Sequence, residues 1–571
     1  MATARILCKT LCLLATGILS CQQLSAQDIS NLSSVKPFSY AGTIEARSMF
    51  YSANGIANRR QPFSYLFSGS PVIGIYGFQI PVSFSFSEAD RSFRQPFNQF
   101  GMSPTYKWIT LHAGYRNVSF SPYTLGGHTM LGAGFELNPG KWRAGFMYGR
   151  LNRATTIDTT SQALVPFSFS RKGYAAKLGY GTAENFFELS YLSAQDDDAT
   201  RPDGLPVQLN VISPAKNDVA GYSFRFTILK NIFFESTGAF SLYTNDINSP
   251  LTLDSVKNEV LQQARKLFRI NATSEYYTAF SGGLGYKSKN YGLKVNYKRI
   301  DPDFKTMGAY FFNSDLENWT ISPTANLLRG RIRFNGSIGI QHDNLKKQKQ
   351  AQNDRLIAAA NAGFELTKAL GVDVIYTNFS DNQKPQTALF ADSLRIVQTN
   401  QTIGIMPRYF IVGANTSHVV SASVNFSNLK DYNNYFEAQA ASRNISTNQY
   451  FINYNISFPK RNLALFLNLS NTRLKGQDLE NTFTGLTLGG NATVLKQKLQ
   501  TGLSCTLTSA QSNTSGDSFI LNASGNLGYL VSRNHKLGLN LFVTNNQSNA
   551  GNLLQSDFTE TRAELSYQFK F

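Results

Sequence analysis

The sequence has little cysteine, little charge and no long apolar run beyond its first residues. Of 571 residues, 16% are charged and four are cysteines. Cys8, Cys12 and Cys21 lie within the first 26 residues, which leaves Cys505 alone in the rest of the chain. A lone cysteine excludes an internal disulfide framework, so we expect Cys505 to be a buried or lipid-facing residue. The absence of an apolar run of roughly 18 residues excludes a helical membrane protein.

Motifs for catalysis, cofactors and metals are also missing. The five histidines are widely separated, and there is no HExxH motif, phosphate-binding loop or G-x-S-x-G elbow. Glycine pairs such as Gly132 and Gly134 fall within predicted strands and are not nucleotide loops. Asp196, Asp197 and Asp198 lack the ligand spacing of a calcium loop, so we expect a solvated acidic tip. We therefore predict a protein that is not an enzyme and has no catalytic residue, cofactor or metal.

The positive charge is spread along the chain. The net charge is +18, but nucleic-acid binding normally requires basic residues clustered on one surface with aromatic residues between them. Here the basic residues are distributed through predicted strands and tight turns. We expect them to occupy turns and to line an internal channel, and we predict no nucleic-acid partner.

The first residues have the pattern of an export signal. Within 1–26, basic residues precede a short apolar run, and the segment ends in small residues. This order predicts a secretory signal peptide cleaved between Ala26 and Gln27. The alternative is a lipoprotein signal in which Cys21 carries the lipid. Residues 27–38 are expected to form a short periplasmic segment before the first strand.

From about residue 39 onward, apolar and polar residues alternate. At the C-terminus, the odd positions from Ala563 to Phe571 are apolar and the even positions between them are polar. A period of two places the two sets on opposite faces of a β-strand. Such strands suit a wall with hydrocarbon outside and water inside, although the strands of a soluble sandwich also alternate. The polar set is mostly small and partly uncharged, which favours a crowded, wet lumen.

The connections between these segments alternate in length. Short ones rich in Asn, Gly and Lys, such as 138–140 and 532–534, are typical of tight hairpins. Long polar ones, such as 195–217 and 301–317, lie between them. Outer-membrane barrels have short periplasmic turns and long extracellular loops. We therefore predict that 39–571 form a single all-β antiparallel transmembrane barrel of about 26 strands, within a range of about 22 to 28.

Two of the long loops have features of their own. Loop 244–274 has apolar residues at helical spacing, which predicts a helix that either acts as a lid across the barrel mouth or packs on the rim. Loop 301–317 contains the adjacent aromatics Tyr310, Phe311 and Phe312. We interpret these three residues as part of an aromatic girdle at the membrane interface, with a recognition patch for a surface partner as the alternative.

Basic residues on the polar face of the strands indicate a positively charged lumen. A positive lumen favours anions and polar solutes. The alternative is that these residues pair with acidic neighbours, which the excess of 54 basic over 36 acidic residues argues against. The predicted lumen residues are Arg143, Arg225, Lys294, Lys298, Arg562 and Lys570.

Taken together, the mature chain resembles large outer-membrane barrel proteins of the Bacteroidota type, most of which have no assigned function. The resemblance is carried by Phe100 to Arg150, by Tyr297 to Trp319 and by the C-terminal strand. It implies an integral protein of the Gram-negative outer membrane, in contact with its lipid. In such barrels the assembly machinery recognises the terminal strand, here through Tyr567, Phe569 and Phe571.

The chain also departs from two better-known groups of barrels. The short segment 27–38 leaves no room for the plug of TonB-dependent transporters or for the periplasmic domain of the lipopolysaccharide-insertion barrel. We predict a porin-like conduit for polar or anionic solutes, partly occluded by its own loops. The alternative is a barrel that anchors or helps to export a secreted surface protein.

Overall fold

The computed structural model describes residues 37–88, 98–155, 167–201, 212–252, 259–310, 313–386, 395–432, 443–514, 516–549 and 557–571. The predicted signal peptide, its cleavage pair Ala26 and Gln27, and Cys21 lie outside these residues. In the part of the chain that is described, no helix has the length and apolar character needed to cross a membrane. Strands dominate, and 29 strand segments form one sheet.

The first part of the wall contains thirteen segments. They are β1 (Phe38–Ala41), β2 (Thr43–Asn54), β3 (Phe63–Gly69), β4 (Val72–Ile75), β5 (Phe78–Ser87), β6 (Gln99–Met102), β7 (Thr105–Tyr106), β8 (Ile109–Ser119), β9 (Gly126–Leu137), β10 (Trp142–Asn152), β11 (Ser170–Gly181), β12 (Phe186–Asp197) and β13 (Lys216–Ile228). In the described residues the short helical elements are η2 (Asp198–Thr200), α2 (Glu259–Ala264), η4 (Leu328–Gly330) and η6 (Pro459–Arg461).

The second part of the wall is more regular. Its segments are β14 (Ile232–Thr244), β15 (Ser274–Lys287), β16 (Tyr291–Ile300), β17 (Leu316–Leu327), β18 (Ile332–His342), β19 (Ala351–Glu365), β20 (Leu370–Pro385), β21 (Ile396–Val412), β22 (Ser417–Asp431), β23 (Ile445–Phe458), β24 (Leu463–Lys475), β25 (Glu480–Val494), β26 (Leu499–Ser512), β27 (Ser518–Leu530), β28 (His535–Ser548) and β29 (Phe558–Lys570).

Three strands of the wall are each broken into two segments, so the 29 segments make 26 strands. β1 continues β2 past a break at Gly42, and β4 continues β3, because β1 pairs with β4 and β2 pairs with β3. β6 and β7 likewise form one strand between β5 and β8. At the first break Gly42 has φ 148°. A Cβ there would meet the Pro71 Cα at 2.6 Å, so only glycine fits.

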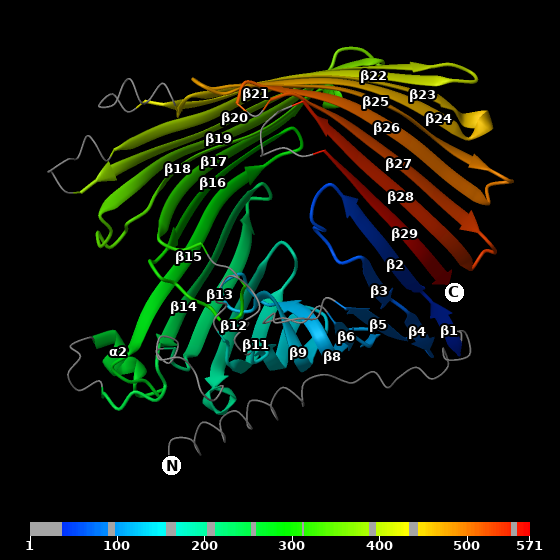
Figure 1. Ribbon diagram of the computed structural model, residues 1–571. Coiled ribbons are helices and arrows are strands. Elements are labelled where there is room, and N and C mark those ends of the chain that lie inside the picture. The colour runs from blue at the N-terminus through cyan, green and yellow to red at the C-terminus, as the bar shows by residue number, and fades with distance from the viewer. Residues whose placement is uncertain are drawn as a thin grey trace.

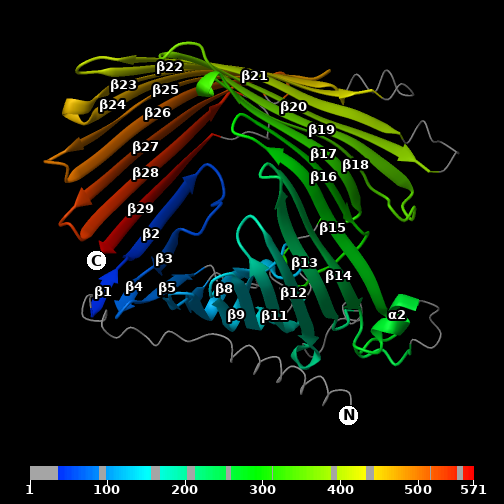
Figure 2. The ribbon, with the colours of Figure 1, turned by 180° about the vertical axis from the view of Figure 1, so that it is seen from behind.

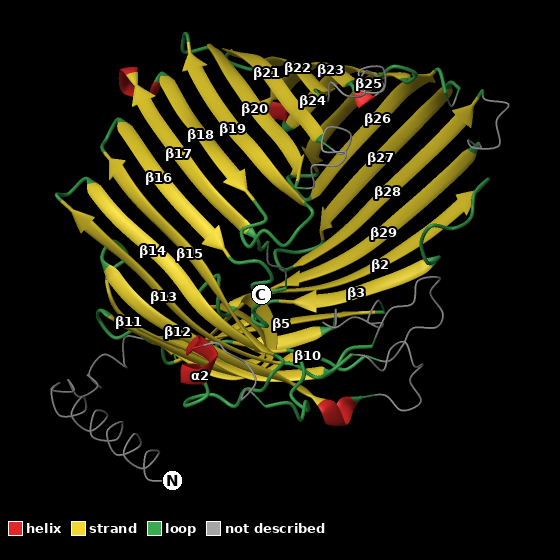
Figure 3. Cartoon of the chain, turned by 90° about the vertical axis from the view of Figure 1, so that its left-hand side faces the viewer, coloured by secondary structure: helices red, strands yellow, loops and turns green. Residues whose placement is uncertain are grey.

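The first and last strands pair and close the sheet. β2 lies antiparallel to β29 from Thr43 opposite Lys570 to Asn54 opposite Thr559, and Figures 1 and 2 show them side by side. At the end of this seam the Gly42 N–H donates to the Phe571 carbonyl oxygen at 3.0 Å, and the Phe571 N–H donates back at 3.1 Å. Figure 3 shows strands around the whole circumference. Closure removes every sheet edge, and the prediction of a closed antiparallel barrel is confirmed.

The two faces of the wall differ as the alternation predicts. The outer face carries exposed apolar side chains on all sides, among them Tyr148 at 56% exposure and Leu503 at 69%. Neighbouring strands bring such residues together, as with Tyr297 and Trp319, whose ring centroids are 4.7 Å apart. An apolar band of this extent is stable against hydrocarbon but not against water. The residues between these outward positions point to the lumen, and they include hydroxyl side chains such as Ser504 and Ser524.

Short and long connections lie at opposite ends of the barrel. The turn end contains connections such as 138–141, 229–231 and 531–534, and the loop end contains 120–125, 301–310 and 343–350. At 229–231, Leu229 and Lys230 have φ of 52° and 62°, as a tight hairpin turn requires. This separation agrees with the alternating connection lengths of the sequence.

Candidate functional site

Two connections at the loop end fold into the barrel and pack against its lumen face. We call residues 120–125 and 301–310 the loop plug. Leu125 is fully buried, and Phe304 and Met307 are 2% and 4% exposed. The backbone joins the two loops, since the Gly126 N–H donates to the Gly308 carbonyl oxygen at 2.8 Å. The long loop is thereby fixed inside the wall.

Polar groups of the wall hold the loop plug in place. The Asn217 side chain is fully buried, and its Oδ1 accepts a 2.9 Å hydrogen bond from the Met307 N–H. The Ser241 hydroxyl donates to the Lys305 carbonyl oxygen at 2.6 Å. Buried backbone groups need such partners, so these two side chains fix the path of the loop.

The apolar core formed with the loop plug covers one side of the lumen only. Its members come from the two loops, from Ala215 and from β8 to β17. Among the residues that the structure describes, β18 to β29 contribute no fully buried apolar side chain. The wall residues in this core are Val118, Met130, Met147, Leu151, Ala175, Leu192, Ala194, Val219, Ala239, Tyr277, Ala279, Ile300 and Leu316.

The other side of the lumen keeps a hydrophilic wall. Small hydroxyl and amide side chains bond across neighbouring strands, as in Ser504 with Ser524 at 2.7 Å and Thr487 with Thr506 at 2.9 Å. The Thr544 hydroxyl donates to the Asn522 Oδ1 at 2.8 Å. Since these groups are satisfied by one another and remain accessible, this side can face water.

Three of the six predicted lumen cations form cross-strand ion pairs. Arg143 contacts Glu188 at 2.7 Å. Arg225 and Lys294 approach Glu235 at 3.6 and 2.6 Å. These pairs differ from our expectation of unpaired cations, because the few carboxylates are placed opposite the basic residues. The register that aligns them cannot be read from composition.

The other three predicted cations are Lys298, Arg562 and Lys570. All three occupy lumen-face positions of their strands, on the opposite side from outward residues such as Tyr297 and Leu565. In the described part of the chain none of the three forms an ion pair. Arg562 also stacks on an aromatic ring, with its Cζ 4.1 Å from the Phe542 centroid. Of the paired cations, Arg225 has a similar contact, with its Cζ 4.3 Å from the Phe233 centroid.

The sequence did not identify two further charged networks. Arg408 contacts both Asp373 and Glu365, and Arg333 contacts Glu365 at 2.8 Å. Glu136 lies between His112, at 3.2 Å, and Lys177. Each network joins three or more strands, so its members are far apart in sequence. One sequence signal could have found them. Each is a charged residue that lies an even number of positions from the other polar residues of its strand, and therefore on the same face.

The acidic run at 196–198 is not a free tip. The Arg171 guanidinium donates two hydrogen bonds to Asp196, at 2.8 and 3.1 Å, and Asp196 is only 4% exposed. Lys172 pairs with Asp197 at 3.1 Å, and Arg201 pairs with Asp198 at 3.1 Å. The expectation of a solvated tip is therefore wrong for Asp196. Within the described ranges no cluster of His, Cys, Asp and Glu has the arrangement of a metal site.

Helix α2 lies against the outer face of the wall. Its Leu261 is 4% exposed and packs with Leu242, Phe240 and Tyr276. Phe240 and Leu242 share the outward parity of Phe234 on β14. The lid interpretation of loop 244–274 is therefore wrong for the described helix, and packing on the rim is correct. Residues 253–258 of this loop lie outside the described residues.

Tyr310 does not belong to an outer girdle. Its ring stacks on His128 with centroids 4.1 Å apart, and its hydroxyl accepts a 3.0 Å hydrogen bond from the Thr129 N–H. His128 is on the lumen face of β9 and is 3% exposed. Tyr310 thus continues the inward path of the loop plug. Phe311 and Phe312 lie outside the described residues.

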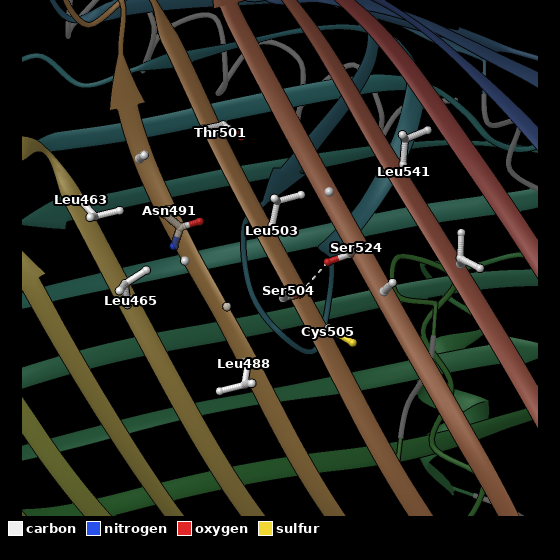
Figure 4. A pocket seen from close by; sticks show the side chains of 16 residues that line it. Leu463, Leu465, Leu488, Asn491, Thr501, Leu503, Ser504, Cys505, Ser524 and Leu541 are labelled. Atoms are coloured by element: carbon white, nitrogen blue, oxygen red, sulfur yellow. Dashed lines mark hydrogen bonds between the residues drawn. The ribbon is translucent and has the colours of Figure 1, made fainter.

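A hollow of about 650 Å³ lies on the outer face over β24 to β28 (Figure 4). Its floor is made of small residues, including Gly490, Cys505 and Gly525, and its rim of leucines such as Leu488 and Leu503. Cys505 is exposed on this face, as expected for a lipid-facing residue. The hollow is apolar and lies on the outer face, so it is a depression in the outer surface of the wall and not part of the lumen.

Comparison with known proteins gives no family. No protein-family model matches the chain, and no curated protein sequence matches it. Solved structures include OccAB4 of Acinetobacter baumannii, with TM-score 0.30, 11% identity and coverage of 70% of this chain and 98% of that one. The ferric-catecholate import receptor Fiu of Escherichia coli has TM-score 0.36 and 11% identity, covering 93% and 81%.

A third similar structure is the Escherichia coli P pilus tip assembly intermediate PapC-PapD-PapK-PapG. Its TM-score is 0.44 and its identity 8%, with coverage of 92% of this chain and 60% of that one. At these TM-scores and identities the likenesses carry no information about what this chain binds or transports. Its architecture rests on its own strand pairing, which makes it a closed 26-stranded antiparallel barrel with an apolar exterior.

Proposed function

We propose that this chain is an outer-membrane conduit for small polar and anionic solutes, narrowed on one side by its own loops. A wall of this strand number encloses far more space than its side chains can fill, as in porins with fewer strands. The apolar exterior supports a position in the lipid, and closed barrels are one of the two structures that can span it. Recognition of Tyr567, Phe569 and Phe571 by the assembly machinery stays a prediction.

The observation that supports a conduit best is the one-sided packing of the lumen. The loop plug and its apolar core occupy the side formed by β8 to β17. Hydroxyl and amide groups line the opposite side, over β25 to β28. A protein whose lumen served only as a rigid support would gain stability from packing on both sides. A hydrophilic half instead leaves a path for water and solutes.

Current through single molecules in a planar bilayer tests this proposal. We expect the purified protein to give steady conductance. Met307→Asp places a charge in the apolar core, so the loop plug should leave the wall and the conductance should rise. Thr514→Asp adds the same charge to an exposed connection at the loop end and should leave the conductance unchanged.

Silence of both the natural protein and the Met307→Asp variant would contradict a conduit. If a surface protein co-purified with the silent barrel, the export or anchoring function would be supported in its place. A conductance that rises equally in both variants would show that charge, and not the position of the loop plug, controls the current.

A further inference from the structure

A second lumen feature lies where the first and last strands meet. It is a pocket of about 450 Å³ at the loop end of the seam, which we call the seam pocket. Tyr51 of β2 lies opposite Arg562 of β29, and Arg562 lies opposite Phe542 of β28. The lining residues are Tyr51, Arg59, Arg60, Phe542, Thr544, Glu560, Thr561 and Arg562.

The connection 55–62 forms one side of the seam pocket. It starts at Gly55, with φ 87°, where an added Cβ would meet the Asp557 carbonyl oxygen at 2.1 Å. It then returns toward β2, where the Arg59 N–H donates to the Tyr51 hydroxyl at 3.4 Å. The turn therefore brings Arg59 and Arg60 to the same pocket as Arg562.

The arginines of the seam pocket outnumber its carboxylates. Three arginines meet one acidic residue, Glu560. Glu560 is already engaged, because Tyr51 donates to its Oε1 at 2.5 Å and Arg59 lies 3.5 Å from its Oε2. Among the described residues Arg562 has no ion pair, and its Nε is buried without a hydrogen-bond partner.

Two aromatic rings orient these arginines. The Arg562 Cζ is 4.1 Å from the centroid of Phe542, and the Arg59 Cζ is 5.1 Å from that of Phe558. Stacking on a ring fixes the plane of a guanidinium and leaves its N–H edge available. That edge matches two oxygens of a carboxylate or phosphate, which guanidinium groups bind in a bidentate way.

We propose that the seam pocket binds the oxyanion group, carboxylate or phosphate, of a solute about the size of a monosaccharide. A pocket of 450 Å³ is within the usual range for small ligands. The Tyr51 and Thr544 hydroxyls donate to Glu560 and Asn522, so their oxygens can accept hydrogen bonds from the rest of the solute. The role of this site in selecting solutes rests on the proposed function as a conduit, whereas binding itself does not.

Calorimetric titration of the detergent-solubilised full chain tests this site. The probes are inorganic phosphate, D-glucuronate and, as the neutral counterpart, D-glucose. We expect saturable binding of at least one anion and none of glucose. If glucuronate binds and phosphate does not, the group recognised is a carboxylate, and the reverse result assigns a phosphate.

Matched variants place the binding in the seam pocket. Arg562→Gln should weaken anion binding about tenfold or more, the effect of losing hydrogen bonds to a charged group. Lys570→Gln removes the same charge from the lumen face of the same strand, about 26 Å away along β29, and should change the affinity less than about twofold. Circular dichroism confirms that both variants keep the barrel.

Equal weakening by both variants would overturn the site, because it would show a general effect of lumen charge. Absence of saturable binding to every anion in the natural protein would also overturn it. Failure of the conduit is separate: a protein that binds anions but gives no current keeps the seam pocket and loses the proposed function. A protein that conducts but binds no anion keeps the proposed function and loses the seam pocket as a binding site.

Discussion

The Thr306 hydroxyl donates a 2.8 Å hydrogen bond to the Thr124 carbonyl oxygen and joins two loops that are 182 residues apart. Both residues are buried inside the barrel. This contact and its neighbours hold the 10-residue stretch 301–310 inside the barrel, so we expect them to limit the open part of the lumen.

Gly308→Ala is expected to displace the loop plug. A Cβ at Gly308 would lie 2.3 Å from the Thr124 carbonyl oxygen and 2.9 Å from Leu192 Cδ2. The backbone oxygen cannot move away cheaply, so we expect a cost of about 1–3 kcal/mol and a larger single-channel conductance. The control is Gly476→Ala, whose Cβ would have its nearest neighbour at 3.6 Å. An unchanged conductance for Gly308→Ala would show that the loop plug does not limit the current.

The path of the loops was the part of the fold that sequence patterns could not predict. Alternation places Arg562 and Leu565 on opposite faces of their strand, since a period of two needs no knowledge of partners. Tyr310 and Leu261 are both apolar residues in long loops, yet Tyr310 turns into the lumen and Leu261 packs outside. Apolar residues in a loop sequence do not indicate whether the loop will pack on the lumen face or on the outer face of the wall.

One signal for the loop plug was nevertheless in the sequence. Met147 and Leu151 are apolar at lumen-face positions of β10, next to outward residues that are also apolar, such as Tyr148. A strand that is apolar on both faces is covered on both faces. The ion pairs were harder to predict from the sequence. Arg143 and Glu188 are 45 residues apart, and their pairing depends on the register of the strands that carry them.

Glu560→Gln is expected to strengthen anion binding in the seam pocket. The substitution removes the one carboxylate of the pocket and releases Arg59 for the ligand. We expect phosphate or glucuronate to bind about threefold more tightly or better, with a steeper dependence on salt. Glu45→Gln removes a carboxylate near the other end of β2 and should have little effect. Weaker binding by Glu560→Gln would show that this carboxylate is part of the recognition.

The connection 343–350 is expected to respond to pH through Asp315 and Lys349. Burial alone would raise the pKa of Asp315, but hydrogen bonds from the Lys349 ammonium and from the Leu345 N–H hold that pKa below its ordinary value. The hydrogen bond with Asp315 raises the pKa of Lys349 in turn. Asp315 is 7% exposed, whereas Lys349 is 53% exposed and is therefore strongly screened by solvent.

The direction of the pH effect follows from these shifts. The depressed pKa of Asp315 stabilises the connection above the ordinary Asp value of about 3.9, and this stabilisation is lost as the pH falls through the depressed pKa. The raised pKa of Lys349 stabilises it below about 10.4, and that is lost at higher pH. Hydrogen exchange of the Leu345 amide, corrected for intrinsic rate, should therefore rise at both extremes. Asp315→Asn should exchange fast throughout, and equal protection in both proteins would contradict the assignment.

Leu261→Ala is expected to release α2 from the wall without opening the lumen. The side chain is 4% exposed against Leu242, Phe240 and Tyr276, so its truncation should cost about 2 kcal/mol or more. Hydrogen exchange should rise over 259–270, because the helix has only six residues and depends on this contact. Single-channel conductance should match that of the natural protein, since α2 packs on the outer face.

Val260→Ala, at a residue 40% exposed on the same helix, is the control for loss of side-chain volume. If the conductance rises with Leu261→Ala and not with Val260→Ala, α2 restricts the barrel mouth. That result would contradict the assignment of α2 to the outer face.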